Sequence, residues 1–492
     1  MRVAKFDVAL SRGQPMCNFR QRVWYAVLVG MALHPLSAAE PEDPDPAYYH
    51  TGELAGSLRS LDPLPLFDAD PQQLWNRLFA AVAIRQSNLP SKRGGTAMPR
   101  VEGGDTIEFL AWPGTTYWDE PATVAPLEGL LDQFLDQHGE QLSTDPLRRV
   151  MLQRDLWAAF DFLIGQNIVR RGDLQVRQRR TQLCRRLALV MQALALPAET
   201  LAKLPDNYAL AVQSGRFSPT HEFDPRRDYL PPRILSDAEE WQELDFYQPK
   251  LSEDIERRFV FLHTYAFRGR SYFRVFYRFP EGRRQLEDYL QQVDAVGIDW
   301  RASGQHGSMT LKSDAPQIPA GTEVALLQFL IALDPNLKPV PTSLVESVRV
   351  IVHKGVDGKR DPTTNTGLGM NVAKYTLKRR LAFDGMKFGG LHREPDDLPV
   401  YRLLFESENA GDWGPRGRFF ELAAECRSCH AGNGQSGVHS IPSLVNSGGI
   451  HSGAQLGVVH TLAAGTPSPH PARTVKWKTA DETYRRLIEF LE

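Results

Sequence analysis

A short motif near the C-terminus constrains this chain more than any other feature of its sequence. Cys426 and Cys429 are two residues apart, and His430 follows the second cysteine directly. Two thiols at this spacing can add across the two vinyl groups of one porphyrin edge, forming two thioethers, and the next imidazole then falls beneath the iron. The pattern predicts one covalently attached haem c, with His430 as an axial iron ligand.

Two other kinds of site use a C-x-x-C pair, namely a redox dithiol and half of a structural zinc site. A thioredoxin-like dithiol would need a βαβ setting, whereas here we expect FFELAAE to precede the motif as a helix and AGNGQSG to follow it as a loop. The chain has no second C-x-x-C to complete a zinc site. Cys184 lies among apolar residues at helical spacing, which predicts a lone buried thiol.

The stretch RFFELAAECRSCHAGNGQSGVHSIPSLV resembles the haem-binding core of class I cytochromes c, a likeness confined to residues 411–492. The resemblance implies that the Pro442 carbonyl, in the step Pro-Ser-Leu, accepts a hydrogen bond from His430 Nδ1 and orients that ring. It also implies a C-terminal helix over 479–492, with Thr479 as its cap. The apolar face of this helix would carry Tyr484, Leu487, Ile488 and Leu491.

The chain departs from that family at the sixth iron ligand. The family takes a methionine from the loop before the last helix, but no methionine follows Met386 here. Four histidines follow the motif instead: His439, His451, His460 and His470. His470 is nearest the family's methionine position and is the expected sixth ligand, although Met370 or Met386 could serve and all four histidines could be solvated loop residues. A second nitrogen ligand would lower the reduction potential relative to methionine, and an empty position would admit small ligands.

The N-terminus has the pattern of a signal peptide. Arg20 and Arg22 precede an apolar run over 23–33, and small residues lead to a predicted cleavage after Ala39. That run is too short for a permanent membrane span, which needs about 20 residues. We therefore expect a periplasmic or otherwise exported protein without a membrane span, whether translation starts at Met1 or Met16. Cys17 would leave with residues 1–39.

Length and charge set the remaining bounds. The chain has 492 residues, enough for two or three domains, and a formal net charge of −2 gives no global field that favours nucleic acid. Residues 40–70, rich in Pro, Asp and Glu, look like an extended lead-in. Residues 71–315 read as a mainly helical region of unknown role, because apolar residues recur at i, i+3, i+4 and i+7. The strongest such segments are 72–85, 125–139, 146–165 and 179–196.

Residues 316–410 change to short runs of β-formers bounded by Pro, Gly, Asp or Asn, which predicts an antiparallel sheet. The four expected strands lie in 323–333, 344–355, 373–383 and 399–407. The expected fold is thus multidomain, with a mainly α N-terminal region, a β-rich middle region, and a small α-helical cytochrome c-like segment over 411–492.

These features favour an exported monohaem c-type cytochrome that transfers electrons between redox protein partners of unknown identity. The alternative is a haem enzyme, peroxidase-like or acting on a small oxygen or nitrogen ligand, with an open sixth iron site. The sequence does not settle whether the protein is an enzyme. It contains no phosphate-binding Gly-rich loop, no H-E-x-x-H helix and no G-x-S-x-G turn, so hydrolase and nucleotide-binding functions lack support.

Overall fold

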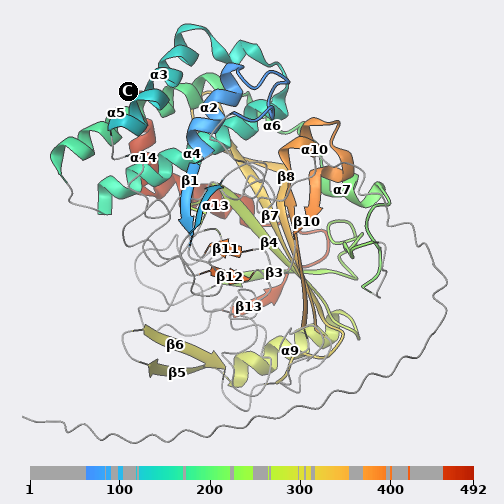
Figure 1. Ribbon diagram of the computed structural model, residues 1–492. Coiled ribbons are helices and arrows are strands. Elements are labelled where there is room, and N and C mark those ends of the chain that lie inside the picture. The colour runs from blue at the N-terminus through green and yellow to red at the C-terminus, as the bar shows by residue number, and fades with distance from the viewer. Residues whose placement is uncertain are drawn as a thin grey trace, which may run out of the picture. The chain divides into compact units, whose positions relative to one another are not determined.

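A computed structural model provides the three-dimensional structure (Figure 1). The described residues are 63–83, 85–89, 98–102, 118, 121–169, 173–221, 227–247, 264, 267–296, 298–303, 306–311, 316–353, 370–394, 399–401, 419–421 and 458–492. The predicted signal peptide lies outside them. The described residues all belong to one compact unit.

The first part of the described chain is helical. Its main helices are α2 (Leu74–Ala83), α3 (Pro121–Asp136), α4 (Pro146–Val169) and α5 (Leu174–Leu194). Each of the four overlaps one of the predicted apolar segments, so the prediction of these helices is confirmed. Helix α5 packs against α4 and α3, and α2 packs against α3 and α4. The shorter helices that follow are α6 (Ala198–Leu201) and α7 (Asn207–Gln213).

The start of α4 shows how the local sequence sets a boundary. Asp145 Oδ1 accepts a hydrogen bond from the Leu147 amide at 2.9 Å, which satisfies one of the amides left free at a helix N-terminus. Pro146 occupies the first helical position, where its missing N–H is no loss. Pro197 is the N-cap residue of α6 and directly precedes its first helical residue.

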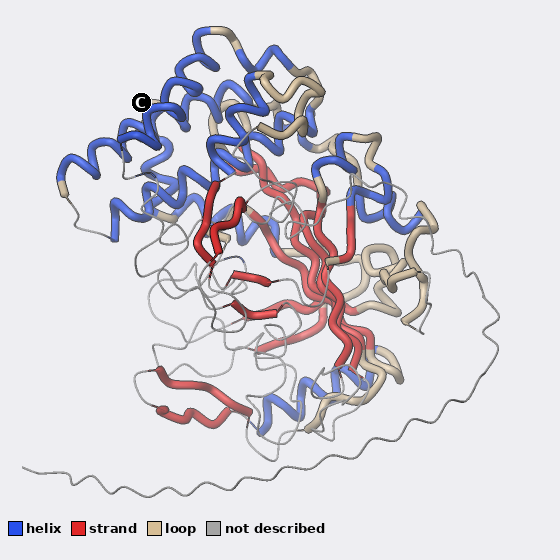
Figure 2. Tube along the Cα trace, in the orientation of Figure 1, coloured by secondary structure: helices blue, strands red, loops and turns tan. Residues whose placement is uncertain are grey.

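An antiparallel sheet of seven strands forms the centre of the fold, in the order β10-β9-β8-β7-β4-β3-β13 (Figure 2). Its strands are β3 (Gln242–Tyr247), β4 (Ser271–Arg278), β7 (Glu323–Leu333), β8 (Pro339–His353), β9 (Met370–Leu377), β10 (Leu391–Arg393) and β13 (Val458–Thr461). The turn between β7 and β8 is closed by Asp334, whose Oδ1 accepts from the amides of Asn336 and Lys338. The mixed α and β architecture agrees with the coarse fold prediction.

The boundary between a helical and a β-rich region at residue 315 is not seen. Strands β3 and β4 lie before this residue and yet belong to the main sheet. Strand β4 pairs with β7, so that Ser271 lies opposite Leu330 and Arg278 opposite Glu323. Strand β4 is rich in aromatic and β-branched residues and is buried on both faces, which is why it fits a central position. The same stretch also holds α9 (Arg283–Val296) and the hairpin β5 (Ile298–Ser303) with β6 (His306–Leu311).

One predicted strand is shorter in the structure, and another is described only in part. The segment 373–383 leaves the sheet after Leu377 and continues as α10 (Arg379–Phe383). Lys378, the N-cap of this helix, is the last residue with an extended backbone. Within the segment 399–407 the structure describes β11 (Pro399–Tyr401), which pairs outside the main sheet with β12 (Phe419–Glu421). Residues 402–407 lie outside the described residues. The prediction of a helix in FFELAAE is wrong at its start, because Phe419–Glu421 is a strand. Two consecutive phenylalanines favour an extended backbone. The hairpin β1 (Arg85–Leu89) and β2 (Met98–Glu102) forms another small sheet.

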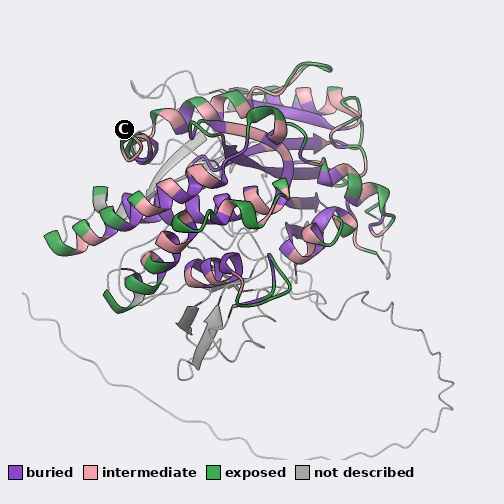
Figure 3. Ribbon diagram, turned by 90° about the horizontal axis from the view of Figure 1, so that it is seen from above, coloured by how far each residue is buried: buried purple, intermediate pink, exposed green. Residues whose placement is uncertain are grey.

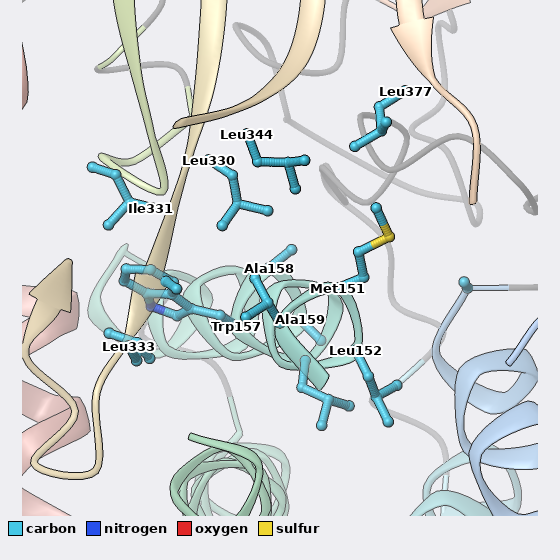
Figure 4. Packing of buried hydrophobic residues seen from close by; sticks show 14 of the residues in the cluster. Met151, Leu152, Trp157, Ala158, Ala159, Leu330, Ile331, Leu333, Leu344 and Leu377 are labelled. Atoms are coloured by element: carbon cyan, nitrogen blue, oxygen red, sulfur yellow. The ribbon is translucent and has the colours of Figure 1, made fainter. Parts of the chain in front are cut away.

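The core lies between α4 and the main sheet, as their direct contact shows. Buried side chains of α4, among them Met151 and Trp157, lie opposite buried leucines of β7, β8 and β9 (Figure 4). Figure 3 shows buried residues concentrated on the strands of the main sheet, whereas the helices carry exposed residues on their outer sides. This packing makes α4 the central helix of the fold.

The chain's last described stretch, 458–492, packs against the main sheet and the helices. Strand β13 pairs with β3, helix α13 (His470–Ala480) contacts β4 and β8, and helix α14 (Glu482–Glu489) packs on α4 and α5. The apolar face predicted for the last helix is confirmed: its four residues are buried or packed on the core. Its cap is Asp481, which accepts from the Thr483 amide at 2.9 Å. The expected cap, Thr479, lies inside α13.

Candidate functional site

Four of the predicted site residues lie outside the described residues, namely Cys426, Cys429, His430 and Pro442. The described chain resumes at Val458, so the structure shows how the stretch that follows the motif is held. The fifth predicted residue, His470, is described. The candidate site therefore comprises two elements of this stretch, β13 and α13, and the strand β3 against which they lie (Figure 1).

His470 is the first residue of α13 and is almost completely buried, with 3% of its surface exposed. Its Nε2 lies 2.9 Å from the Leu244 carbonyl oxygen on β3. A carbonyl only accepts, so Nε2 carries the proton and donates. Burial lowers the pKa of His470, although the nearby Glu243 opposes this shift. The imidazole is thus neutral and its tautomer is set by the β3 backbone.

Glu243 and Asp245 stand two residues apart on β3, so their side chains share one face of the strand. Together with the polar side chains that contact them they form what we call the edge cluster. Its members are Glu243, Asp245, Arg274, His460, Ser468, His470 and Arg473.

Glu243 has two close partners. Arg274 of β4 binds its carboxylate with both Nε (3.0 Å) and a terminal nitrogen (2.6 Å), and Ser468 donates to Oε1 at 2.6 Å. His470 Nε2 lies 3.9 Å from the same Oε1, which is too far for a hydrogen bond. The Leu244 carbonyl is thus the hydrogen-bond partner of His470, and Glu243 acts on it as a nearby negative charge.

Asp245 holds the first turn of α13. Arg473 donates to both carboxylate oxygens of Asp245, at 3.1 Å for Oδ2, which is the bidentate geometry of a strong pair. His460 of β13 contacts the same carboxylate, with its Nε2 atom 3.5 Å from Asp245 Oδ2. The two acids of β3 are therefore linked to both β13 and α13.

A second contact fastens β13 from its other side. Arg283 of α9 donates to the Thr461 hydroxyl at 3.0 Å and to the Leu462 carbonyl at 2.9 Å. Thr461 in turn donates to Glu287 Oε1, 3.0 Å away. This contact involves only β13 and α9, not His470.

The far end of α13 is held by a buried ion-pair cluster. Lys478 Nζ donates to both oxygens of Asp161 on α4, at 3.0 and 2.8 Å, and to the Thr483 hydroxyl at 3.2 Å. Arg270 donates to the same carboxylate at 2.8 Å. Burial alone would raise the pKa of Asp161, but Lys478 and Arg270 outweigh it and lower that pKa. Both ends of α13 are thus fixed by charged groups.

More buried charges lie along α4. Arg154 Nε pairs with Glu346 Oε1 of β8 at 3.0 Å, and Gln328 donates to Oε2 of the same carboxylate at 2.9 Å. The neighbouring Asp155 pairs with Arg379 of α10. Burial raises the pKa of Asp155 to about 7, while Arg379 opposes the shift. Titratable groups with shifted pKa values are frequent at functional sites but also occur in structural networks.

Cys184 lies on the buried face of α5 with a free thiol, as predicted. Burial raises the pKa of this thiol well above its usual range. A protonated, buried thiol is a poor nucleophile and metal ligand. Its position also separates it from solvent, so it behaves as a small apolar core residue.

Met370 and Met386, the two methionines named above as possible iron ligands, both lie within the described residues. Met386 sits where α10 turns into the short 3-10 helix Lys387–Gly390 and packs against the hydrophobic core. Met370 begins β9. His460 is about half exposed in the edge cluster, and His439 and His451 lie outside the described residues.

The last three findings concern metal-binding groups, membrane-spanning helices and similarity to known proteins. Among the described residues, no group of three or more His, Cys, Asp or Glu side chains could hold a metal ion. No described helix has the length and apolarity needed to cross a membrane. Comparison of the chain with protein families, curated proteins and solved structures found no match.

Proposed function

We propose that this chain is an exported protein that carries one covalent haem c and transfers electrons between redox protein partners. The observation that carries the proposal is the motif itself, with thioethers to Cys426 and Cys429 and axial ligation by His430. The resemblance to class I cytochromes c adds Pro442, whose carbonyl would accept from His430 Nδ1. A cytochrome c-like arrangement of residues around the motif is part of this proposal.

The described thiol supports this use of the motif. Cys184 is buried in α5 and has a raised pKa, so it is a poor fourth ligand for a zinc site or partner for a disulfide. The predicted cleavage removes Cys17. Cys426 and Cys429 are then the reactive pair of the mature chain.

His470 meets the requirements for the sixth ligand. Metal ligation needs a neutral imidazole, and a ligating histidine usually donates its other ring N–H to a carbonyl or carboxylate. The buried His470 donates Nε2–H to the Leu244 carbonyl, which is the kind of contact that orients a ligating histidine. Bound haem would supply one-electron redox chemistry, and the residues of the edge cluster would hold the ring and exclude water from it.

One observation favours the alternative function, a haem enzyme with an open sixth site. The sequence offers no methionine after Met386, although class I cytochromes c take their sixth ligand from a methionine before the last helix. Without a sixth ligand the iron would bind oxygen, peroxide or a small nitrogen compound. This alternative shares the haem attachment and differs only at the distal side of the iron.

Mass spectrometry of the mature protein, produced with cytochrome maturation machinery, tests the proposal. We expect the mass of one haem to remain attached after denaturation, and to be lost in the variant Cys426→Ser/Cys429→Ser. The matched control is Cys184→Ala, which should retain the haem. A denatured wild-type protein with two free motif thiols and no added mass would rule out the proposal.

Two further measurements address the finer points. N-terminal sequencing of the exported form should begin at Glu40 or close to it, and an unprocessed cytoplasmic chain as the main product would contradict export. Absorption spectra with and without carbon monoxide or cyanide separate the two functions. A six-coordinate, unreactive iron supports electron transfer, whereas ready ligand binding supports the enzyme.

A further inference from the structure

Three cationic side chains lie near one carboxylate, that of Asp161 on α4. Arg270 donates to its Oδ2 atom at 2.8 Å, and Lys478 donates to both of its oxygens. Burial lowers the pKa of Arg270 to about 10 although Asp161 opposes the shift, and the nearby positive charge of Arg268 lowers it further. Positive charge is therefore in excess beside Asp161, and burying an uncompensated charge is unfavourable.

Two buried N–H groups beside this carboxylate have no acceptor among the described residues. They are Nε of Arg270 and Nε1 of Trp157, which lies four residues before Asp161 on the same face of α4. Arg270 is 3% exposed and Trp157 0%. The neighbouring acid Glu346 is already paired with Arg154. Because buried donors in native proteins nearly always have an acceptor, one from outside the described chain is expected here.

Arg268 combines a strained backbone with a guanidinium that no described residue pairs with. Its φ of 50° is left-handed, which is unfavourable for a residue with a side chain and occurs most often at functional sites. Its Nη2 atom lies 3.1 Å from the position that a Cβ on Gly165 would take. Within the described part of the chain, no hydrogen bond or ion pair engages this guanidinium.

Gly165 leaves room for Arg268 against the helix. Trp157, Asp161 and Gly165 recur every four residues, so they form one stripe of α4. The stripe and the cations beside it form what we call the arginine cluster, whose members are Trp157, Asp161, Gly165, Arg268, Arg270 and Lys478. Since Arg268 is only partly buried, its side chain connects the cluster with solvent.

We propose that the arginine cluster binds an oxyanion, a carboxylate or phosphate group, through Arg268 and Arg270. The planar fork of a guanidinium pairs with two oxygens of either group. One such anion compensates the excess positive charge and accepts the hydrogen bond that Arg270 Nε–H offers. Asp161 and Lys478 keep their own pair and hold Arg270 in place. Haem attachment is not required for this site.

A purely structural role for Arg268 would also use its charge. Gly165 lies near the C-terminal end of α4, and this end of a helix attracts cations through its dipole. Arg268 would then stabilise the helix end without any ligand. The two roles differ in one measurable respect, which is how the protein responds to added oxyanions.

The test titrates the full-length mature protein with sodium phosphate or sodium acetate in place of sodium chloride, at constant pH and ionic strength. Binding is followed by calorimetry and by the midpoint of thermal unfolding, which rises when a ligand binds only the folded state. The variants are Arg268→Gln and Gly165→Ala. The matched control is Arg485→Gln, which removes an exposed arginine from α14.

We expect a saturable response of the wild type and of Arg485→Gln, and affinity weaker by about tenfold or more in Arg268→Gln, which loses a charged hydrogen-bond partner. Gly165→Ala should weaken binding too, because its Cβ displaces the guanidinium. Alanine favours a helix more than glycine does, so this variant should bind less without unfolding more easily. It keeps the test decisive if Arg268→Gln does not fold.

The outcomes decide for or against the site and identify the anion. A response to phosphate alone would assign a phosphate group, and a response to acetate alone a carboxylate. No saturable response to either anion would overturn the proposal, and so would equal affinities in the wild type, Arg268→Gln and Gly165→Ala. In those cases Arg268 would act only on the end of α4.

Discussion

Lys478 Nζ lies 2.8 Å from Asp161 Oδ2, and both side chains are fully buried although 317 residues separate them in sequence. Asp161 also accepts from Arg270, so one carboxylate compensates two buried cations. Lys478 lies above the ring of Trp157 as well, at 5.1 Å from the ring centroid. The pair ties α13 to the central helix α4.

This shared carboxylate predicts an order of stability losses. Asp161→Asn leaves two buried cations without a counter-ion and should reduce the free energy of unfolding by about 3–5 kcal/mol, the usual loss when a buried pair is broken. Lys478→Met should cost less, because Arg270 still compensates Asp161. Lys476→Met, on the exposed side of the same helix, is the matched control and should be near neutral. Urea unfolding measures all three, and a Lys478→Met loss larger than that of Asp161→Asn would contradict the shared-carboxylate account.

Asp155 predicts a pH dependence. Its folded pKa is raised to about 7 by burial, whereas an unfolded aspartate titrates near 4. Between these values the folded state binds a proton that the unfolded state does not, so this group's contribution to stability falls as the pH rises from about 4 to 7. The groups that face it are Arg379, Arg154 and Glu346.

The measurement is the difference in unfolding free energy between the wild type and Asp155→Asn at several pH values. The wild type should lose stability relative to the variant as the pH rises, by up to about 1.4 kcal/mol for each unit of pKa shift. Taking the difference cancels other titrating groups, including His470, whose lowered pKa acts in the opposite direction. A difference that is flat between pH 5 and 8 would show that Asp155 stays ionised beside Arg379.

A side chain at Gly389 should clash with the backbone of Asn207, close to β8. Its φ of 65° is left-handed, and a Cβ built there would lie 2.0 Å from the backbone oxygen of Asn207, whose side chain bonds Val345 of β8. Gly389→Ala should therefore lose the roughly 1–2 kcal/mol of a left-handed alanine plus a clash of similar size. Gly385→Ala shares the φ but meets nothing within 4 Å, so it isolates the backbone part. Equal losses in thermal unfolding would argue against the close approach.

The sequence predicts the helices of this protein better than its sheet. Apolar spacing reports directly on a helix face, which is why α2 to α5 appear where they were expected. Strand β4 is rich in β-formers, but the helical segments before it made the whole of 71–315 look helical. Strand β13 has four residues, too few for a periodic pattern to be recognised.

The edge cluster could not be predicted, because its partners meet only in three dimensions. Glu243 contacts Ser468, 225 positions later in the chain, and Asp245 contacts Arg473, 228 positions later. The local signal is an acid at alternate positions of a short apolar stretch, QELDFY, which suggests a strand with one charged face. Likewise Arg154, Asp155 and Asp161 interrupt the apolar run of α4, and charges on an otherwise apolar helix indicate buried ion pairs.

The last prediction concerns His470 itself. In the haem protein, His470→Ala removes the proposed sixth ligand and its bond to Leu244. A five-coordinate iron is high-spin and open, so the spectrum should change from low to high spin and carbon monoxide should bind readily. His439→Ala, His451→Ala and His460→Ala should change the spectrum little, and His460→Ala is the closest control because it also contacts the edge cluster.

The possible outcomes assign the ligand. A His470→Ala protein that stays low-spin would move the ligand to Met370, Met386 or another histidine; among these, Met386 is packed on the core and would have to leave it. A wild-type protein that is already high-spin and binds carbon monoxide would favour the haem enzyme, with His470 serving only to join α13 to β3. The buried, neutral imidazole with its proton on Nε2 leads us to expect a low-spin wild type that the His470→Ala change converts to high spin.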